Sequence, residues 1–400
     1  MNAGVGARNA RQRRGGDVRD TIREFAEQHR STSIIVAMAV IAAVLPVLAA
    51  VPPFSLFQPH NAWVDGFANA GTYVLLAVGL NIVVGLAGLL DLGYAAFFAF
   101  GAYAYAYGAS PFSHNDLPFL PLLLVGAAVA ATFGVILGAP TLRLRGDYLA
   151  IVTLGFGEIV PEVITNLGPN NSFGWPNITN GTNSIFGIDQ PSLGPLQFST
   201  DQLPWYYLGL AALVAIIWLA GRLENSRLGR AWIAMREDEL AAACMGINLT
   251  RTKLSAFAMG AFFSGIAGMI NGSRLQTITP DSFRFEVSIT ILTMVVLGGM
   301  GSIPGVLIGA LIVASVQLTL LDKLTTVVNG LGGLTHVAFL QTLDLTQGKN
   351  LIFGLLLVLM MIFRREGLFP SSRRRVELRP TTVHEQAEEN VQLAGLREEA

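Results

Sequence analysis

The chain has 400 residues, of which 52% are apolar and only 13% are charged, and its mean hydropathy is +0.53. Soluble domains have about 25% charged residues, so this composition excludes an ordinary water-soluble protein. The net charge of −1 gives no sign of nucleic-acid binding. The single cysteine, Cys244, excludes an internal disulfide and a metal site built from cysteines.

Apolar segments that approach the thickness of a membrane recur along the chain. A bilayer core about 30 Å thick requires roughly 20 apolar residues in a helix. We therefore predict an all-α integral membrane protein with about ten transmembrane helices. Two segments, 287–298 and 351–363, are short enough to be re-entrant, which leaves nine to ten spans. The expected spans are 33–51, 67–88, 93–109, 119–139, 148–164, 205–220, 254–271, 287–298, 303–321 and 351–363.

The distribution of Lys and Arg predicts how these spans are oriented. Basic residues stay on the cytoplasmic side of a membrane. Of the 26 Lys and Arg, 22 lie in the two chain ends, the loop 221–253 and the turn after the fourth span, whereas the loop 165–204 has none. Both termini are therefore expected in the cytoplasm, as charged tails at 1–32 and 371–400 that flank a transmembrane domain at 33–370.

Two glycine-rich stretches join neighbouring apolar segments with almost no polar linker. They are GLAGLLDLG at 85–93 and GGMGSIPG at 298–305. They predict tight hairpins or broken helices, whose exposed backbone dipoles can hold a zwitterionic or ionic substrate. Close packing of helices explains most of the other glycines within the spans. The second stretch lacks the GK[ST] ending of a phosphate-binding loop, which excludes that function.

Few ionisable residues lie within or directly beside the expected spans. They are Asp91, Glu158 and Glu162, with Asn81 as a polar companion. Because a charge within the membrane is unfavourable, we interpret them as candidates for a translocation pathway. Two alternatives stay open. Glu158 and Glu162, four residues apart on one helix face, can instead reach interfacial water, and Asp91 can cap the helix that begins near Gly93.

The loop 221–253 contains a short predicted helix around Glu239 to Met245. Acidic residues at its start, the run Ala241 to Met245 and Gly246 as a stop favour this helix. Leu240, Ala243 and Cys244 share one face, with Ala242 at or beside it. Such a helix can dock in a groove on a partner protein. A surface helix without a partner is the alternative.

This loop resembles the EAA loop of ABC importer permeases, whose Glu-Ala-Ala and following Gly form the coupling helix on the ATPase. Ala241, Ala242 and Gly246 match that pattern, whereas Leu240 occupies the Glu position and Glu239 precedes it.

Longer stretches across the chain resemble a more specific family. They begin at Leu80 (LNIVVGLAGLLDLGYAAFFAFGAYAYA), Leu142 (LRLRGDYLAIVTLGFGEI) and Ser226 (SRLGRAWIAMREDELAAACMGIN), and a terminal FRREGLFP follows. They are similar to LivM-type permeases of branched-chain amino-acid ABC importers, over residues 67–370.

This resemblance implies a transport subunit in the inner or plasma membrane, without enzymatic activity and without a cofactor of its own. The implied partners are a second related permease, two cytoplasmic ABC ATPase subunits that bind ATP and Mg²⁺, and an extracytoplasmic protein that delivers leucine, isoleucine or valine. It also implies an ATPase-coupling role for Glu239, Leu240, Ala241, Ala242 and Gly246. The absence of a Walker A sequence agrees with ATP hydrolysis by another subunit.

Three other functions compete with this one. A related ABC permease for urea or short amides fits the same residues. A stand-alone secondary transporter or channel needs no coupling loop, and it usually contains more intramembrane carboxylates. A membrane enzyme needs clustered His, Asp or Glu, whereas the five His residues are scattered over loops and tails.

Overall fold

The computed structural model describes residues 30–49, 60–113, 115–141, 147–169, 174, 176–191, 198, 202–317, 321, 324–326, 328–329, 348–364 and 367–369. The charged tails expected at 1–32 and 371–400 therefore lie almost entirely outside the described residues.

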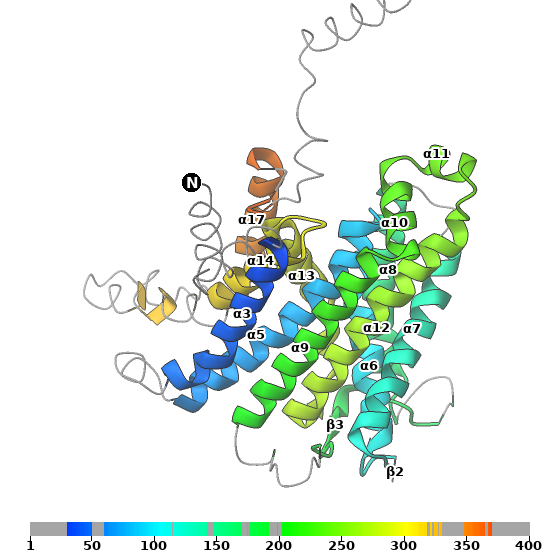
Figure 1. Cartoon of the computed structure of the whole chain (residues 1–400). Helices are drawn as coiled ribbons and strands as arrows, with labels where there is room; N and C mark the ends of the chain where they lie inside the picture. Colours follow the sequence, from blue (N-terminus) through cyan, green and yellow to red (C-terminus); the bar gives the residue numbers. More distant parts are fainter. Residues whose placement is uncertain are drawn as a thin grey trace, which may run out of the picture.

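The described residues are mostly helical (Figure 1). The α-helices are α3 (Arg30–Ala49), α5 (His60–Leu80), α6 (Tyr94–Gly108), α7 (Phe119–Thr141), α8 (Asp147–Asn166), α9 (Gln202–Glu224), α10 (Arg227–Glu237), α11 (Glu239–Cys244), α12 (Leu249–Leu275), α13 (Phe285–Gly298), α14 (Ile303–Ser315) and α17 (Lys349–Phe363). The π-helix η2 (Asn81–Leu86) and the short 3-10 helices η3 (Gly181–Asn183) and η4 (Pro280–Phe283) complete them.

Each of the ten expected spans contains a helix in the part of the chain that the structure describes. Five helical segments are long and apolar enough to cross a membrane: Asn61–Leu86, Phe119–Thr141, Tyr148–Asn166, Gln202–Glu224 and Leu249–Leu275. Three shorter apolar helices accompany them: Ile34–Leu48, Ile303–Ser315 and Lys349–Phe363. The chain is thus a helical protein with several apolar helices of membrane-spanning length, and the total of ten spans stays a prediction.

Helix α12 lies at the centre of the bundle, where it packs against α5, α6 and α7. Small residues allow the backbones to approach closely. A Cβ atom added to Gly101 of α6 would lie 2.7 Å from the carbonyl carbon of Gly265 in α12, which leaves no room for a side chain. The interpretation of these glycines as packing residues is consistent with this contact.

Short strands and a returning loop cover the lower end of the bundle in Figure 1. Strand β1 (Ala109–Ser110) pairs antiparallel with β2 (Asn115–Asp116), and β3 (Ile185–Phe186) pairs antiparallel with β4 (Thr277–Ile278). The amide of Asp189 donates to the carbonyl of Ala109 at 2.8 Å. The Tyr105 hydroxyl donates to the carbonyl of Asp189, also at 2.8 Å. The loop that contains β3 is therefore fixed to the end of α6.

Most of the loop 221–253 is helical, and it lies at the upper end of Figure 1 with α10 and α11. Sequence analysis predicted only the short helix that corresponds to α11. It missed α10, and α12 begins at Leu249 rather than at residue 254. Helix α10 has one buried face, with Trp232 and Met235, and an opposite charged face. A search for long apolar runs does not detect such an amphipathic helix.

Candidate functional site: the loop 221–253 and the glycine-rich junction

Helix α10 is fixed to α12 by a buried tryptophan. The Ser226 hydroxyl accepts a hydrogen bond from the amide of Gly229 and so caps the start of α10. One turn later the indole nitrogen of Trp232 donates to the carbonyl of Thr252 at 3.1 Å and to the Ser255 hydroxyl at 2.9 Å. Trp232 is fully buried. Trp232 therefore holds α10 against the start of α12.

Helix α11 is short, but it has defined ends. The Asp238 carboxylate accepts hydrogen bonds from the amides of Leu240 at 2.7 Å and Ala241 at 3.0 Å, which makes Asp238 the N-cap. Gly246 has φ +85°, the left-handed conformation typical of the residue after a helix. Lys253 of α12 forms an ion pair with Glu239 at 2.7 Å. Together these contacts hold α11 in one orientation.

The outer face of α11 is apolar and uncovered by the described part of the chain. Leu240 is 75% exposed and Met245 is 83% exposed, and Ala243 and Cys244 are exposed beside them. Ala242, by contrast, is only 4% exposed. Ala242, which the sequence placed at or beside the proposed docking face, is therefore turned inward in the structure. Ala242 packs inward because α11 lies against α10 and α12.

We define the glycine-rich junction as η2, the following turn at 87–93 and the turn 299–302 between α13 and α14. Helix α5 continues directly into the π-helix η2. The carboxamide oxygen of Asn81, at the start of η2, accepts a hydrogen bond from the amide of Gly301 at 2.8 Å. Asn81 is 1% exposed. The two glycine-rich stretches also contact each other directly, since a Cβ added to Gly85 would lie 2.6 Å from the amide nitrogen of Gly301.

Arg236 connects the loop 221–253 to this junction. Its guanidinium donates to the carbonyl of Gly85 in η2. Its methylene groups pack on Gly88, where an added Cβ would lie 2.6 Å from the Arg236 Cγ and where φ is +70°. Sequence analysis did not single out Arg236, because Glu237 and Asp238 beside it are typical of a solvated surface. No local signal could have identified a partner 151 residues away.

The segment after α17 packs on the same junction. The amide of Leu368 donates to the carbonyl of Leu297 at 2.8 Å, and the amide of Phe369 donates to the carbonyl of Gly298 at 3.0 Å. These bonds satisfy carbonyl groups at the end of α13 that have no partner within the helix. The terminal FRREGLFP stretch therefore stabilises the turn between α13 and α14.

Asp91 is buried in the turn that follows η2. Its Oδ1 accepts a hydrogen bond from the amide of Gly93 at 2.9 Å, and the neighbouring amide of Leu92 donates to the Thr153 hydroxyl of α8 at 3.0 Å. The Oδ2 atom of Asp91 is buried, with no hydrogen-bond partner among the described residues. This geometry favours the alternative in which Asp91 organises the start of α6.

Glu158 and Glu162 lie elsewhere, on the exposed face of α8. Glu162 accepts a hydrogen bond from the Asn166 side chain at 2.8 Å. The hydrogen bond with Asp281 raises the pKa of Arg284, and the negative charges of Asp281, Glu158 and Glu286 raise it further. The four pathway candidates therefore do not form one site, since Asn81 and Asp91 are buried near the junction and the two glutamates are exposed.

A helical membrane protein with glycine-broken helices and a capped, exposed helix between two spans has the features of a transporter subunit. The sequence profile of the family described as "Branched-chain amino acid transport system / permease component" matches residues 63–363. The chain belongs to this family, and it is a multi-pass membrane protein.

Two relatives are named "High-affinity branched-chain amino acid transport system permease protein LivM". The protein from Salmonella typhimurium is 38% identical over 346 residues, which cover 81% of this chain and 73% of the relative. The protein from Escherichia coli K12 is 38% identical over 358 residues, 84% of this chain and 76% of the relative. The LivH permease of Salmonella typhimurium is 27% identical over 62% of this chain and 81% of the relative. No solved structure matches the chain significantly.

Proposed function

We propose that this chain is a membrane-spanning permease subunit of an ATP-driven ABC importer for leucine, isoleucine and valine. The similarity to two LivM proteins over most of both chains supports this function. The observation that carries the mechanism is the exposed apolar surface of α11 and of the residue that follows it, where Leu240 and Met245 are uncovered by the described part of the chain.

The ATPase subunits dock on this face of α11 and bind ATP and Mg²⁺ themselves. A helix with one exposed apolar face fits a groove on a partner, in which Leu240 and Met245 become buried. In this arrangement Ala241 lies beside the docking residues, whereas Glu239, Ala242 and Gly246 fix the helix to the rest of the chain. Closure of the ATPases on ATP then moves α11 and α10 together.

Arg236 transmits this movement to the membrane-embedded helices. Because its guanidinium is bonded to η2, a displacement of α10 changes the backbone of the π-helix and the turn that Asn81 contacts. π-Helical segments are frequent at functional sites, and broken helices line the substrate sites of many transporters. Asn81 and Asp91 therefore belong to the moving part of the pathway.

A second, related permease covers the exposed face of α8. Carboxylates at membrane depth face a water-filled space or a protein partner rather than lipid. Glu158 and Glu162 therefore line the interface between the two permeases, where the translocation pathway forms. The similarity of this chain to both LivM and LivH permeases supports a pair of related subunits.

The importer lies in the inner membrane with both termini in the cytoplasm, because the basic residues concentrate at the ends and in the loop 221–253. The end of the bundle with α10 and α11 then faces the cytoplasm. The opposite end, with the short strands, receives substrate from an extracytoplasmic binding protein.

Uptake of labelled substrates tests the proposed substrate class. Cells that lack the gene should lose high-affinity uptake of labelled leucine, and the gene on a plasmid should restore it. Unlabelled isoleucine and valine should compete with leucine, whereas urea and phenylalanine should not. Loss of urea uptake together with normal leucine uptake would instead assign the chain to the related permeases for urea or short amides.

A further inference from the structure

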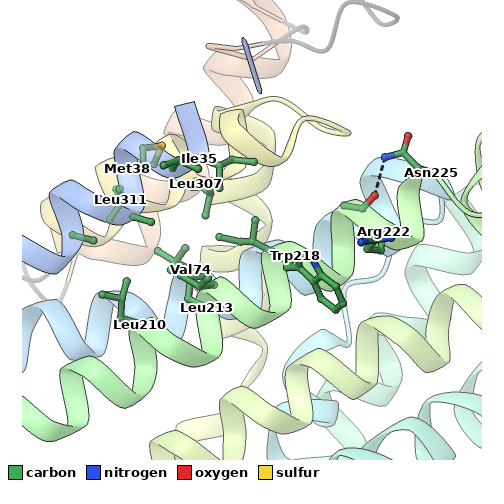
Figure 2. Close-up of a pocket in the computed structure, with 16 residues that line it drawn as sticks. Ile35, Met38, Val74, Leu210, Leu213, Trp218, Arg222, Asn225, Leu307 and Leu311 are labelled. Atoms are coloured by element: carbon green, nitrogen blue, oxygen red, sulfur yellow. Dashed lines mark hydrogen bonds between the residues drawn. The ribbon is translucent and has the colours of Figure 1, made fainter. Parts of the chain in front are cut away.

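A long apolar groove lies between α3, α5, α9 and α14, on the side of the bundle away from α8. Figure 2 shows the apolar side chains that line it, among them Met38, Val74, Leu213 and Leu307. The groove has a volume of about 450 Å³. A second space of about 370 Å³ continues it toward the opposite end of the bundle and shares Met38, Val74 and Leu213. An open apolar groove in a membrane protein takes up an apolar chain from the bilayer.

Polar groups occur at one end of this groove. Arg222 and Asn225 line that end, where α9 leads into α10 (Figure 2). The guanidinium of Arg222 lies over the ring of Trp218, 5.2 Å from its centre, and Trp218 is 62% exposed. A basic residue stacked on an aromatic ring is the arrangement found where a membrane protein meets the lipid headgroups.

The length of the groove matches one leaflet of a bilayer. At about 1.5 Å per residue, the part of α9 from Leu210 to Arg222 is about 18 Å long. Half of a bilayer with its headgroup region is about 20 Å thick. A chain that begins at the headgroup level beside Arg222 therefore ends near the midplane, beside Leu210.

We propose that this groove binds an anionic phospholipid of the leaflet on the α10 side. An acyl chain occupies the apolar part, and the phosphate group pairs with the Arg222 guanidinium at the polar end. Two parallel hydrogen bonds from an arginine to a phosphate give such a pair its strength. The Asn225 side chain, which donates to the carbonyl of Gly221 at 2.9 Å, borders the same headgroup position.

A helix of a partner subunit is the competing occupant of the groove. The Arg222 guanidinium at the polar end favours a phosphate group over an apolar helix face, because an apolar face gives that charge no partner. The proposal requires only that the chain lies in a membrane, so its failure would leave the proposed transport function intact.

Quenching of Trp218 fluorescence by brominated lipids tests the proposal. The assembled transporter is reconstituted in nanodiscs with brominated phosphatidylglycerol or brominated phosphatidylcholine at equal mole fraction. The signal of Trp218 is the difference between the wild type and Trp218→Phe. We expect phosphatidylglycerol to quench at about fivefold lower mole fraction, the effect of one basic residue at an anionic membrane surface. Arg222→Gln should abolish this preference. Arg230→Gln, which removes an exposed arginine from nearby α10, should retain it.

Two results would overturn the proposal. Equal quenching by the two lipids in the wild type would mean contact with bulk lipid only. Absence of quenching by either lipid would mean that a protein partner fills the groove. If Trp218→Phe does not fold, native mass spectrometry of the wild type and Arg222→Gln replaces the fluorescence measurement. Retention of an anionic phospholipid by the wild type and its loss from the variant would then support the site, and equal retention would refute it.

Discussion

Helix α11 and the glycine-rich junction differ in where their side chains find partners. At the junction, Asn81 and Gly301 are hydrogen-bonded to each other inside the chain, and Asn81 is buried. On α11, the polar groups are also satisfied, by Asp238 and by the Lys253–Glu239 ion pair. The large apolar side chains of α11, however, point away from the described protein.

This difference indicates which part of the molecule needs a partner. A substitution at the junction should disturb the fold of this chain whether or not other subunits are present. A substitution on the outer face of α11 should leave the fold unchanged and disturb only assembly. Arg236 lies between the two regions. Its replacement should leave the fold and the assembly largely intact and should weaken the communication between the two regions.

The largest effect is expected for Leu240→Asp. In a docked helix the new carboxylate would be buried without a partner, which costs about 3–5 kcal/mol, whereas in a solvated surface helix the change stays within about 0.5 kcal/mol. The ATPase subunits should therefore no longer copurify with the permease, although its unfolding midpoint stays the same.

Thr250→Asp is the matched control for this substitution. It adds the same charge on the same side of the protein, at an exposed position in the first turn of α12, where a negative charge is favourable. This variant should keep its ATPase subunits. Retention of the ATPases and normal transport by Leu240→Asp would restore the interpretation of α11 as a surface helix without a partner.

A smaller, purely structural effect is expected for Gly298→Ala at the junction. The added Cβ would lie 2.7 Å from the Val306 Cα, and its neighbours are backbone atoms that cannot rotate away. Overpacking of this kind destabilises a protein by about 1–3 kcal/mol. Thermal unfolding of the isolated permease should detect the loss.

Gly155→Ala in α8 serves as the comparison, because its added Cβ meets no atom within 4 Å. Alanine is the better residue within a helix by about 0.5–1 kcal/mol, so this variant should be as stable as the wild type or slightly more stable. Equal stability of Gly298→Ala and Gly155→Ala would mean that the turn between α13 and α14 is looser than described.

The smallest change is expected for Arg236→Met, which keeps the packing on Gly88 but loses the hydrogen bond to Gly85. Arg236 is half-buried, so solvent screening reduces the contribution of this hydrogen bond to about 1 kcal/mol. Stimulation of ATP hydrolysis by the loaded binding protein should therefore fall about fivefold. The ATPases should still copurify. Arg230→Met in the same helix should respond normally, since the bond that the Arg230 guanidinium makes among the described residues is to the carbonyl of Asn225 at the surface. Normal stimulation of Arg236→Met would remove the proposed link.

The helices were predictable from the sequence where a long run of apolar residues forms them. Each expected span contains a helix, because a long run of apolar residues favours a buried helix whether lipid or protein surrounds it. The helix α10 escaped because only one of its faces is apolar. The π-helix η2 could not be predicted at all, since its geometry depends on contacts of Asn81 and Gly85 with residues far away in the sequence.

The existence of the helix α11 was predictable from the sequence, but its orientation was not. The caps Asp238 and Gly246 are local signals that a sequence displays. The inward position of Ala242 is not local, because the packing of a six-residue helix against α10 and α12 decides which side faces out. Arg236 was missed for the same reason, since its partner lies in another part of the chain.

The central claim is that the outer face of α11 contacts an ATPase subunit, and the single cysteine of the chain tests it without any substitution. Cys244 is exposed on that face. The purified permease is labelled there with a photoreactive maleimide, mixed with its ATPase subunits and illuminated. The account predicts a crosslink from Cys244 to an ATPase subunit, and protection of Cys244 from the maleimide when the ATPases bind first. Full reactivity of Cys244 in the assembled transporter, with no crosslink to an ATPase, would contradict it.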